Sequence, residues 1–279
     1  MRIVVGFVVS DKKLRHLTDR GFFNPSSDSV EYVAVTSGEN LDRFDLVISK
    51  IHSEIDPDFF AQIEGNPRHA APFRVQKLFQ DRYAMIQTMW KGSKAQSPDS
   101  ALISAGDWDI VSAFLLEHER VILKPRAACG TPDSHDLCIA SSLLEVKWFI
   151  EKRSGEFILQ QFVDHDETFF KIFVIGSNIS IFRRKSIGSN SAQFNSQGGV
   201  FSESLDGLGD ITRAQQSELE LIATEITSMF STSLLGIDVV RGNSRFFVVD
   251  INYFPSYNEL GPMFRTLMDR YCRELVRLS

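Results

Sequence analysis

The residues of this sequence whose types and spacing point most clearly to chemistry lie near its end. Two neighbouring hydrophobic segments, 234–241 and 245–250, contain Asp238 and Asp250, and Asn252 follows the second aspartate by two positions. Because side chains alternate along a strand, Asp250 and Asn252 share one face. Carboxylate and amide oxygens suit Mg²⁺, which binds one or two carboxylates together with phosphate oxygens and water. We therefore predict a magnesium site formed by Asp238, Asp250 and Asn252.

Asp250 carries more weight in this interpretation than Asp238. An aspartate near a strand end is often a turn residue, and that alternative stays open for Asp238 taken alone. Asp250 lies inside a run that is otherwise apolar, where burying a carboxylate without a partner is costly. The combination favours a metal site.

Two lysines also lie in apolar strand segments. Lys124 follows the apolar residues 121–123, and Lys171 lies between Phe170 and Ile172. An ammonium at such a position either points to solvent from a half-exposed strand or pairs with an anion such as a nucleotide phosphate. Beside the predicted metal site, we favour the second alternative.

Further residues could contact a nucleotide or a polyphosphate. Residues 160–163 join two predicted strand segments and could offer backbone groups to a purine, although any two-sided strand could look the same. The loop that contains His135 and the basic run 183–186 could contact phosphates. For a surface cation the alternative is simple solvation, and for His135 it is a structural hydrogen bond.

Composition limits the possible partners. The chain has 279 residues and a formal net charge of −6, with 43% hydrophobic residues, which is typical of a globular protein. An excess of acidic residues argues against a protein that coats nucleic acid or an anionic membrane, although a local basic pocket remains possible. No apolar run approaches the length of a membrane-spanning helix, so we expect no membrane insertion. Cys129, Cys138 and Cys272 have no disulfide-framework or zinc spacing, which favours the cytoplasm.

The elements that must position these residues alternate between strand and helix in the first part of the chain. Continuous apolar runs with intervening helical segments favour a small parallel sheet. Its predicted strands are 2–9, 31–35 and 45–49, with helices at 11–20 and 56–64. An amphipathic run at 73–90 predicts one helix, and residues 91–98 have the composition of a linker.

The rest of the chain predicts mixed α/β structure. We expect helices at 107–118, 141–152, 212–230 and 259–277, and strands at 121–124 and 157–163. A hairpin is predicted at 169–175 and 179–184, because Gly176-Ser177-Asn178 is typical of a turn. Residues 185–212, rich in Ser, Gly and Asn, predict a long loop. The fold class is therefore α/β (α+β).

A set of short motifs along the chain occurs in the order found in one known family. They are Asp45 to Lys50, Asp81-Arg82, Leu123-Lys124-Pro125, Gly130-Thr131 with Ser134-His135, Gly236-Ile237-Asp238, and Asp250-Ile251-Asn252 with Phe254-Pro255. This ordered set resembles the inositol 1,3,4-trisphosphate 5/6-kinase family, also called inositol-tetrakisphosphate 1-kinases, over nearly the whole chain. Three positions depart from its pattern: Ser49 replaces a histidine, Cys129 a polar or charged residue and Ser256 a glycine.

The resemblance implies an ATP-grasp fold with an N-terminal Rossmann-like domain. It divides the chain into an N-terminal α/β domain on the inositol-phosphate side (1–92), a central ATP-grasp domain (93–161) and a C-terminal ATP-grasp domain with the metal site (162–279). It also implies an ATP-dependent kinase that transfers the γ-phosphate to a hydroxyl of a soluble inositol tris- or tetrakisphosphate. The expected cofactors are ATP and Mg²⁺, with two ions.

The resemblance further implies a role for each matching residue. Mg²⁺ would be held by Asp238, Asp250 and Asn252. ATP would be bound by Arg82, Lys124, Gln160, Gln161, Phe162, Val163 and Ser186. The inositol phosphate would be bound by Lys13, Lys50, His135, Lys171 and Asn252. Lys171, His135 and Asp250 would be catalytic, with His135 either accepting a proton or donating to a phosphate.

Two other functions remain open at this point. An ATP-grasp carboxylate–amine ligase shares the metal carboxylates and the nucleotide site, but activates a carboxylate as an acyl phosphate. The basic set Lys13, Lys50, His135 and Lys171 favours a polyanionic acceptor over that ligase. A non-catalytic sensor is the other alternative, disfavoured by the intact metal-side residues. We expect a monomer whose partner is a small molecule and not a nucleic acid.

Overall fold

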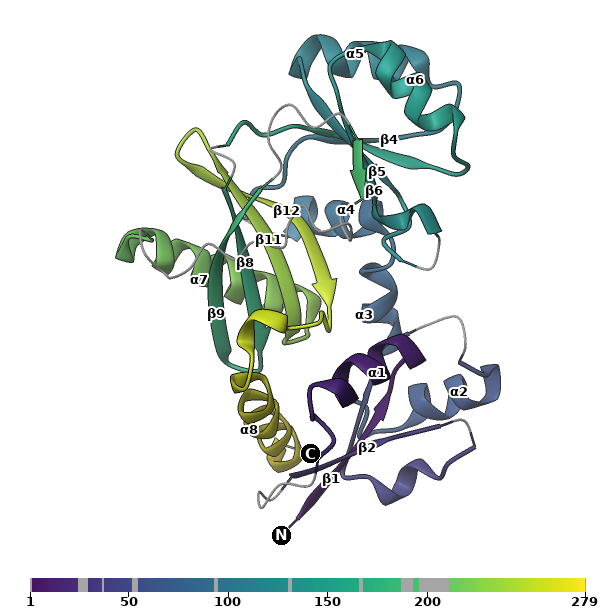
Figure 1. The fold of residues 1–279 in the computed structure, drawn as a ribbon, viewed down its shortest axis with the longest axis vertical. Helices are drawn as coiled ribbons and strands as arrows, with labels where there is room; N and C mark the ends of the chain where they lie inside the picture. The colour runs from purple at the N-terminus through teal and green to yellow at the C-terminus, as the bar shows by residue number, and fades with distance from the viewer. Residues whose placement is uncertain are drawn as a thin grey trace.

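Three sheets organise the chain in the computed structural model (Figure 1). The structure describes residues 2–24, 30–36, 38–51, 55–92, 95–129, 132–165, 168–186, 193–195 and 211–278. Within these ranges the first sheet has three strands, the second five and the third four. None of the helices found there combines the length and apolar character that a bilayer crossing requires.

The first sheet is parallel, with the strand order β2-β1-β3. Its strands are β1 (Ile3–Val8), β2 (Val30–Ala34) and β3 (Leu46–Ser49), and its helices are α1 (Asp11–Asp19) and α2 (Pro57–Gly65). The hydroxyl of Ser10 caps α1 by accepting from the Lys13 amide, and Asp56 caps α2. The predicted parallel sheet is confirmed, whereas its Rossmann-like character stays a prediction.

The single helix predicted at 73–90 is wrong. Two helices, α3 (Phe73–Leu78) and α4 (Arg82–Gly92), meet at a break that contains Asp81. The Asp81 carboxylate accepts from the amides of Tyr83 and Ala84 at 3.0 and 3.1 Å, so it caps the start of α4. An aspartate competes with the helix for backbone donors in this way, and the apolar periodicity of the run hides the break.

The second sheet is antiparallel, with the order β10-β6-β5-β7-β4. Its strands are β4 (Ser100–Ile103), β5 (Val121–Pro125), β6 (Asp136–Ala140), β7 (Phe157–Gln161) and β10 (Gln193–Asn195), packed beside α5 (Trp108–His118) and α6 (Leu143–Glu151). Strand β6 was not predicted, and β10 interrupts the loop predicted at 185–212. Residues 187–192 and 196–210 of that loop lie outside the described residues.

The third sheet is also antiparallel, with the order β12-β11-β8-β9. It contains the predicted hairpin, β8 (Thr168–Ile175) and β9 (Asn178–Lys185), and the two aspartate strands, β11 (Leu234–Gly242) and β12 (Arg245–Tyr253). Helix α7 (Arg213–Phe230) begins with a capping box of Thr212 and Gln215. The last helix, α8 (Met263–Leu278), begins later than predicted because residues 258–260 form a 3₁₀ turn.

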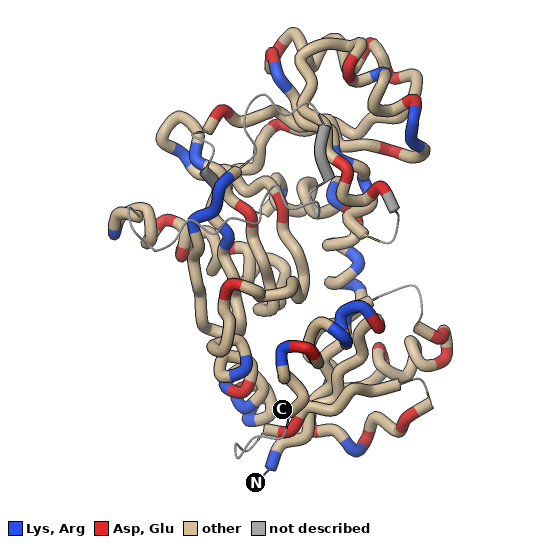
Figure 2. Tube along the Cα trace, in the orientation of Figure 1, with Lys and Arg blue, Asp and Glu red and all other residues tan. Residues whose placement is uncertain are grey.

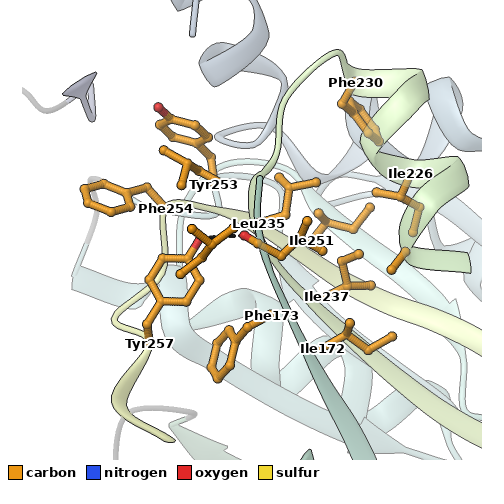
Figure 3. Packing of buried hydrophobic residues seen from close by; sticks show 14 of the residues in the cluster. Ile172, Phe173, Ile226, Phe230, Leu235, Ile237, Ile251, Tyr253, Phe254 and Tyr257 are labelled. Atoms are coloured by element: carbon orange, nitrogen blue, oxygen red, sulfur yellow. Dashed lines mark hydrogen bonds between the residues drawn. The ribbon is translucent and has the colours of Figure 1, made fainter. Parts of the chain in front are cut away.

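One hydrophobic core joins the first and third sheets. The rings of Phe7 on β1 and Phe254, just after β12, lie 6.0 Å apart, and both side chains are fully buried. Phe254 belongs to an aromatic group with Tyr257 and Phe173, shown in Figure 3, in which the Tyr257 hydroxyl donates to the Val174 carbonyl at 3.1 Å. The five-stranded sheet has a separate core under α5 and α6. The predicted domain limits stay a prediction.

Candidate active site

A cavity of about 410 Å³ lies between the five-stranded and four-stranded sheets, with lining residues from both. All of the predicted site residues line it except Lys13 and Lys50. They are Arg82, Lys124, His135, Gln160, Gln161, Phe162, Val163, Lys171, Ser186, Asp238, Asp250 and Asn252. Residues separated by as many as 170 positions thus meet in one place, because the cavity is built where the two sheets face each other.

Three charged residues form a row across the third sheet. Asp238 on β11 lies directly opposite Lys171 on β8 and opposite Asp250 on β12 in the strand register. The Lys171 ammonium is 2.5 Å from a carboxylate oxygen of Asp238. Burial raises the pKa of Asp238, the Lys171 charge opposes this shift, and the Asp250 carboxylate adds to it. Two carboxylates and one ammonium therefore share a poorly solvated floor of the cavity.

A β-bulge next to Asp250 places an extra backbone group toward the cavity. Asp238 pairs with Asp250 but Val239 pairs with Val248, so Val249 has no partner residue on β11. The Val249 carbonyl instead accepts a hydrogen bond from the Lys124 ammonium at 2.9 Å. The bulge thus joins the metal-side strand to the strand that carries Lys124.

Lys124 is held from the other side by Gln160. Its ammonium donates to the Gln160 side-chain oxygen at 2.7 Å, and Gln160 donates in turn to the Ser100 hydroxyl at 3.0 Å. Lys124 is only 7% exposed, and this burial lowers its pKa to about 8. The nearby carboxylate of Asp250 opposes the shift. A cation so poorly solvated gains strongly from an anionic ligand.

The oxygen donors Asp238, Asp250 and Asn252 fit a divalent cation. All three line the same cavity, and the Asn252 amide donates to a carboxylate oxygen of Asp250 at 3.0 Å, so the side chains converge. The donor set is composed of carboxylate and amide oxygens, without sulfur or imidazole, and this is the chemistry that Mg²⁺ prefers. The predicted ligand set is therefore compatible with the geometry.

Arg82 organises the cavity wall through backbone carbonyls. Its guanidinium donates to the carbonyls of Pro125, Ala127 and Ser134 at 2.7, 3.0 and 3.1 Å. It thereby holds the end of β5 and Ser134, the neighbour of His135, against α4. Burial and the neighbouring Arg82 charge lower the pKa of His135, which favours a neutral imidazole at neutral pH. Gly130 and Thr131, in the same predicted motif, lie outside the described residues.

The segment 160–163 lies against the β11–β12 hairpin. A Cβ atom on Gly242 would come within 2.4 Å of the Val163 side chain and 2.8 Å of the Asp164 carbonyl. Only glycine permits this close approach. Ser186 lies nearby, where its hydroxyl is 2.7 Å from Nε2 of His165.

Sequence reasoning missed several lining residues. His165 had no spacing signal, because its place beside Ser186 depends on how segment 162–165 crosses the end of β9. The apolar walls could not be separated from ordinary core residues by sequence pattern. They are Ile122, Leu137, Phe169, Val240 and Val249.

Arg184, part of the basic run visible on β9 in Figure 2, also lines the cavity and pairs with Glu259 at 2.9 Å.

Lys13 and Lys50 lie apart from the main cavity. Lys50 lines a second cavity of about 50 Å³, which adjoins the first because Ala128 and Asn252 line both. The Lys13 ammonium donates to the Pro255 carbonyl at 2.5 Å. Burial lowers the pKa of both lysines, and their neighbouring cations lower that of Lys13 further. These two cations therefore mark the side of the site that faces the first sheet.

The arrangement of sheets around this cavity is similar to that of solved ATP-grasp proteins. The D-alanine–D-alanine ligase of Bacillus anthracis matches with a TM-score of 0.69 over 100% of this chain and 98% of its own, at 12% identity. The RimK domain ATP-grasp protein of Sphaerobacter thermophilus matches with a TM-score of 0.65 over 97% and 99%, at 14% identity. The protein therefore has the ATP-grasp fold.

The sequence is similar to one family within that fold. The model of the inositol 1,3,4-trisphosphate 5/6-kinase ATP-grasp domain matches residues 109–273. Inositol-tetrakisphosphate 1-kinase 2 of Glycine max is 31% identical over 172 residues, 56% of this chain and 53% of that protein. Inositol-tetrakisphosphate 1-kinase 1 of Zea mays is 24% identical over 99% of this chain and 89% of its own. The chain belongs to the inositol 1,3,4-trisphosphate 5/6-kinase family.

Proposed function

We propose that this protein transfers the γ-phosphate of ATP to a free hydroxyl of a soluble inositol tris- or tetrakisphosphate. The observation that carries the proposal is the charged row of Lys171, Asp238 and Asp250 on the cavity floor, in a chain of this kinase family. Phosphoryl transfer depends mainly on positioning and on neutralising charge, and this row supplies groups for both.

The nucleotide would occupy the part of the cavity nearest the second sheet. Lys124 and Arg82 are the cations there, and the backbone of 160–163 lies beside the apolar walls Ile122 and Leu137. Apolar walls with a few polar groups are typical of a purine site. We assign Lys124, Arg82, Ser186 and the segment 160–163 to ATP.

Asp238, Asp250 and Asn252 would hold Mg²⁺, and we propose two ions because two carboxylates face one cavity. When bound, Mg²⁺ supplies charge neutralisation at the β- and γ-phosphates. The two aspartates would hold the ion beside Lys171.

The acceptor would lie toward the first sheet, where Lys13 and Lys50 are. Together with Lys171 and His135 they provide four basic side chains for a polyanion. Burial lowers the pKa of His135 and so favours the neutral imidazole, the form that can accept the proton of the attacking hydroxyl. This favours the proton acceptor among the two roles considered for His135.

We further assign residues 1–92 to acceptor binding, 93–161 to the nucleotide and 162–279 to the metal. A monomer in the cytoplasm is the proposed setting. The support for the cytoplasm is that Cys129, Cys138 and Cys272 form no disulfide, as a reducing compartment allows.

The test is incubation with ATP, Mg²⁺ and a panel of inositol phosphates, followed by NMR of the product to identify the phosphorylated hydroxyl. The ligase alternative has one observation in its favour, the similarity of fold to a D-alanine–D-alanine ligase. Release of ADP only when a carboxylate and an amine are both present, with no phosphorylated inositol, would replace the kinase by the ligase.

A further inference from the structure

Lys171 and Asp238 form the shortest charged contact of the cavity floor. The ammonium and the carboxylate oxygen are 2.5 Å apart, and the two side chains are only 15% and 20% exposed. The two residues are direct partners in the register of β8 and β11. The attraction between opposite charges is strong in such a poorly solvated place.

The same Asp238 carboxylate belongs to the proposed metal ligand set. A divalent cation at this carboxylate would lie within a few ångströms of the Lys171 ammonium, where two positive charges repel strongly. Asp250 cannot take over as the partner of Lys171 without the same conflict, because it is a ligand as well. The ammonium and the metal are therefore competitors for one carboxylate.

The stem of Lys171 lies beside the Phe254–Pro255 turn, on the acceptor side of the site. Gly236 precedes Asp238 by two positions on β11 and so lies on the same face of the strand. A Cβ atom on Gly236 would stand 3.6 Å from Cε of Lys171 and 2.9 Å from Cγ of Pro255. Glycine at this position therefore lets the lysine stem and the Phe254–Pro255 turn lie close together. That turn is where Lys13 and Lys50 also place their ammonium groups.

We infer that Lys171 is exchanged between two anions: it neutralises Asp238 until a divalent cation binds that carboxylate, and it then turns to a phosphate of the acceptor. This inference rests on the proposed function, because it uses Asp238 as a metal ligand and a phosphorylated acceptor. Metal binding would then precede acceptor binding, because the metal releases the Lys171 ammonium that binds the acceptor.

The consequence that can be measured is a change in metal affinity without nucleotide. A group that competes with the metal for its ligand lowers metal affinity, so its removal raises that affinity. If Lys171 only helped to shape the site, its removal would instead lower the affinity for the metal. We therefore expect Lys171→Met to bind a divalent cation more tightly than the parent protein, although the variant has lost a residue of the site.

The experiment measures Mn²⁺ binding to the nucleotide-free protein from the electron paramagnetic resonance signal of free Mn²⁺. Lys171→Met should lower the Kd for Mn²⁺ by about tenfold, because the cation no longer has to displace the Lys171 ammonium from Asp238. Lys171→Arg keeps the charge and should stay within about twofold of the parent protein. Lys185→Met is the matched control, because it removes the same charge from an exposed position on β9. Lys185 lines neither described cavity.

The outcomes separate this inference from the proposed function. Equal or weaker Mn²⁺ binding by Lys171→Met would overturn the inference, as would an equal gain in Lys185→Met, which would indicate a general field effect. If Lys171→Met does not fold, Lys171→Gln keeps a hydrogen-bond donor without the charge and should show the same direction of change. Mn²⁺ binding that is unaffected by Asp238→Asn would instead contradict the metal assignment itself.

Discussion

The ammonium groups of Lys13 and Lys50 donate to the same backbone oxygen, that of Phe254, over distances of 3.4 and 3.1 Å. Lys13 comes from α1, and Lys50 directly follows β3. The oxygen belongs to the turn that begins two residues after Asn252. The first sheet is thus connected by two cations to the strand that supplies the proposed metal ligands.

This relationship predicts a selective loss of acceptor affinity. Lys13→Met and Lys50→Met should each raise the KM for the inositol phosphate by about tenfold to a hundredfold, because a hydrogen bond to a charged group contributes about 1.5–3 kcal/mol. The KM for ATP should stay nearly constant. Steady-state kinetics with each substrate varied in turn measures both values.

Lys12→Met is the matched control for these two variants. Lys12 is an exposed neighbour on α1, and its substitution removes the same charge from the same helix. An equal rise in acceptor KM for Lys12→Met would mean that the general field of α1, and not specific contacts, binds the acceptor.

Asp250→Asn should reduce kcat by at least about a hundredfold while the protein stays folded. The substitution keeps the shape and the hydrogen bond with Asn252 but removes the charge that a divalent cation requires. Circular dichroism and a thermal melt would confirm the fold. A rate close to that of the parent protein would contradict the assigned metal role.

Nucleotide affinity should fall as the pH rises through about 8. Burial lowers the pKa of Lys124 to about 8, so the free protein loses this positive charge above that pH. Titrations with a non-hydrolysable ATP analogue between pH 7 and 9 should show this weakening in the parent protein. In Lys124→Met the affinity should be lower throughout and should lack the inflection.

The lowered pKa of Lys124 affects stability in the opposite direction: the free energy of unfolding should rise with pH, whereas the nucleotide affinity should fall. Because the pKa of Lys124 is higher in the unfolded chain, the unfolded state binds more protons between about pH 8 and 10.5. The contribution of this group to the free energy of unfolding therefore rises across that window. A flat difference between the parent protein and Lys124→Met over this range would contradict the lowered pKa.

Gly242→Ala should destabilise the protein and weaken nucleotide binding together. The added methyl group would overlap the Val163 side chain and the Asp164 carbonyl, and overpacking of this kind costs about 1–3 kcal/mol. We expect a lower Tm and a higher KM for ATP, because residues 160–163 must move. Gly65→Ala is the control, since a Cβ atom there would have nothing within 4 Å apart from its chain neighbours and its own helix backbone.

Much of the fold could be predicted because its elements have clear local signals. The β8–β9 hairpin follows from its turn residues, and the parallel strands follow from continuous apolar runs. The break at Asp81 was missed because a capping aspartate inside an apolar period looks like a surface residue. Strand β6 was missed because five residues after a polar loop give little periodicity.

Some residues of the candidate site could likewise be predicted from the sequence, and others could not. Charged residues in apolar strands, such as Asp250 and Lys171, were visible in the sequence because burying a charge needs a reason. His165 was invisible, since its position depends on tertiary structure alone. The Val249 bulge was equally hidden, because one extra residue in a strand leaves no mark in composition.

The core shared by the first and third sheets has a consequence for how the chain folds. Phe7 packs near Phe254, and the Tyr32 hydroxyl donates to Asp269 at 2.6 Å, so the first sheet contacts residues more than 230 positions later. Such contacts require the closure of a very long loop, which slows folding. During synthesis the N-terminal strands would expose apolar surface until β12 and α8 leave the ribosome. Loss of α8 by truncation should therefore unfold the beginning of the protein as well as its end.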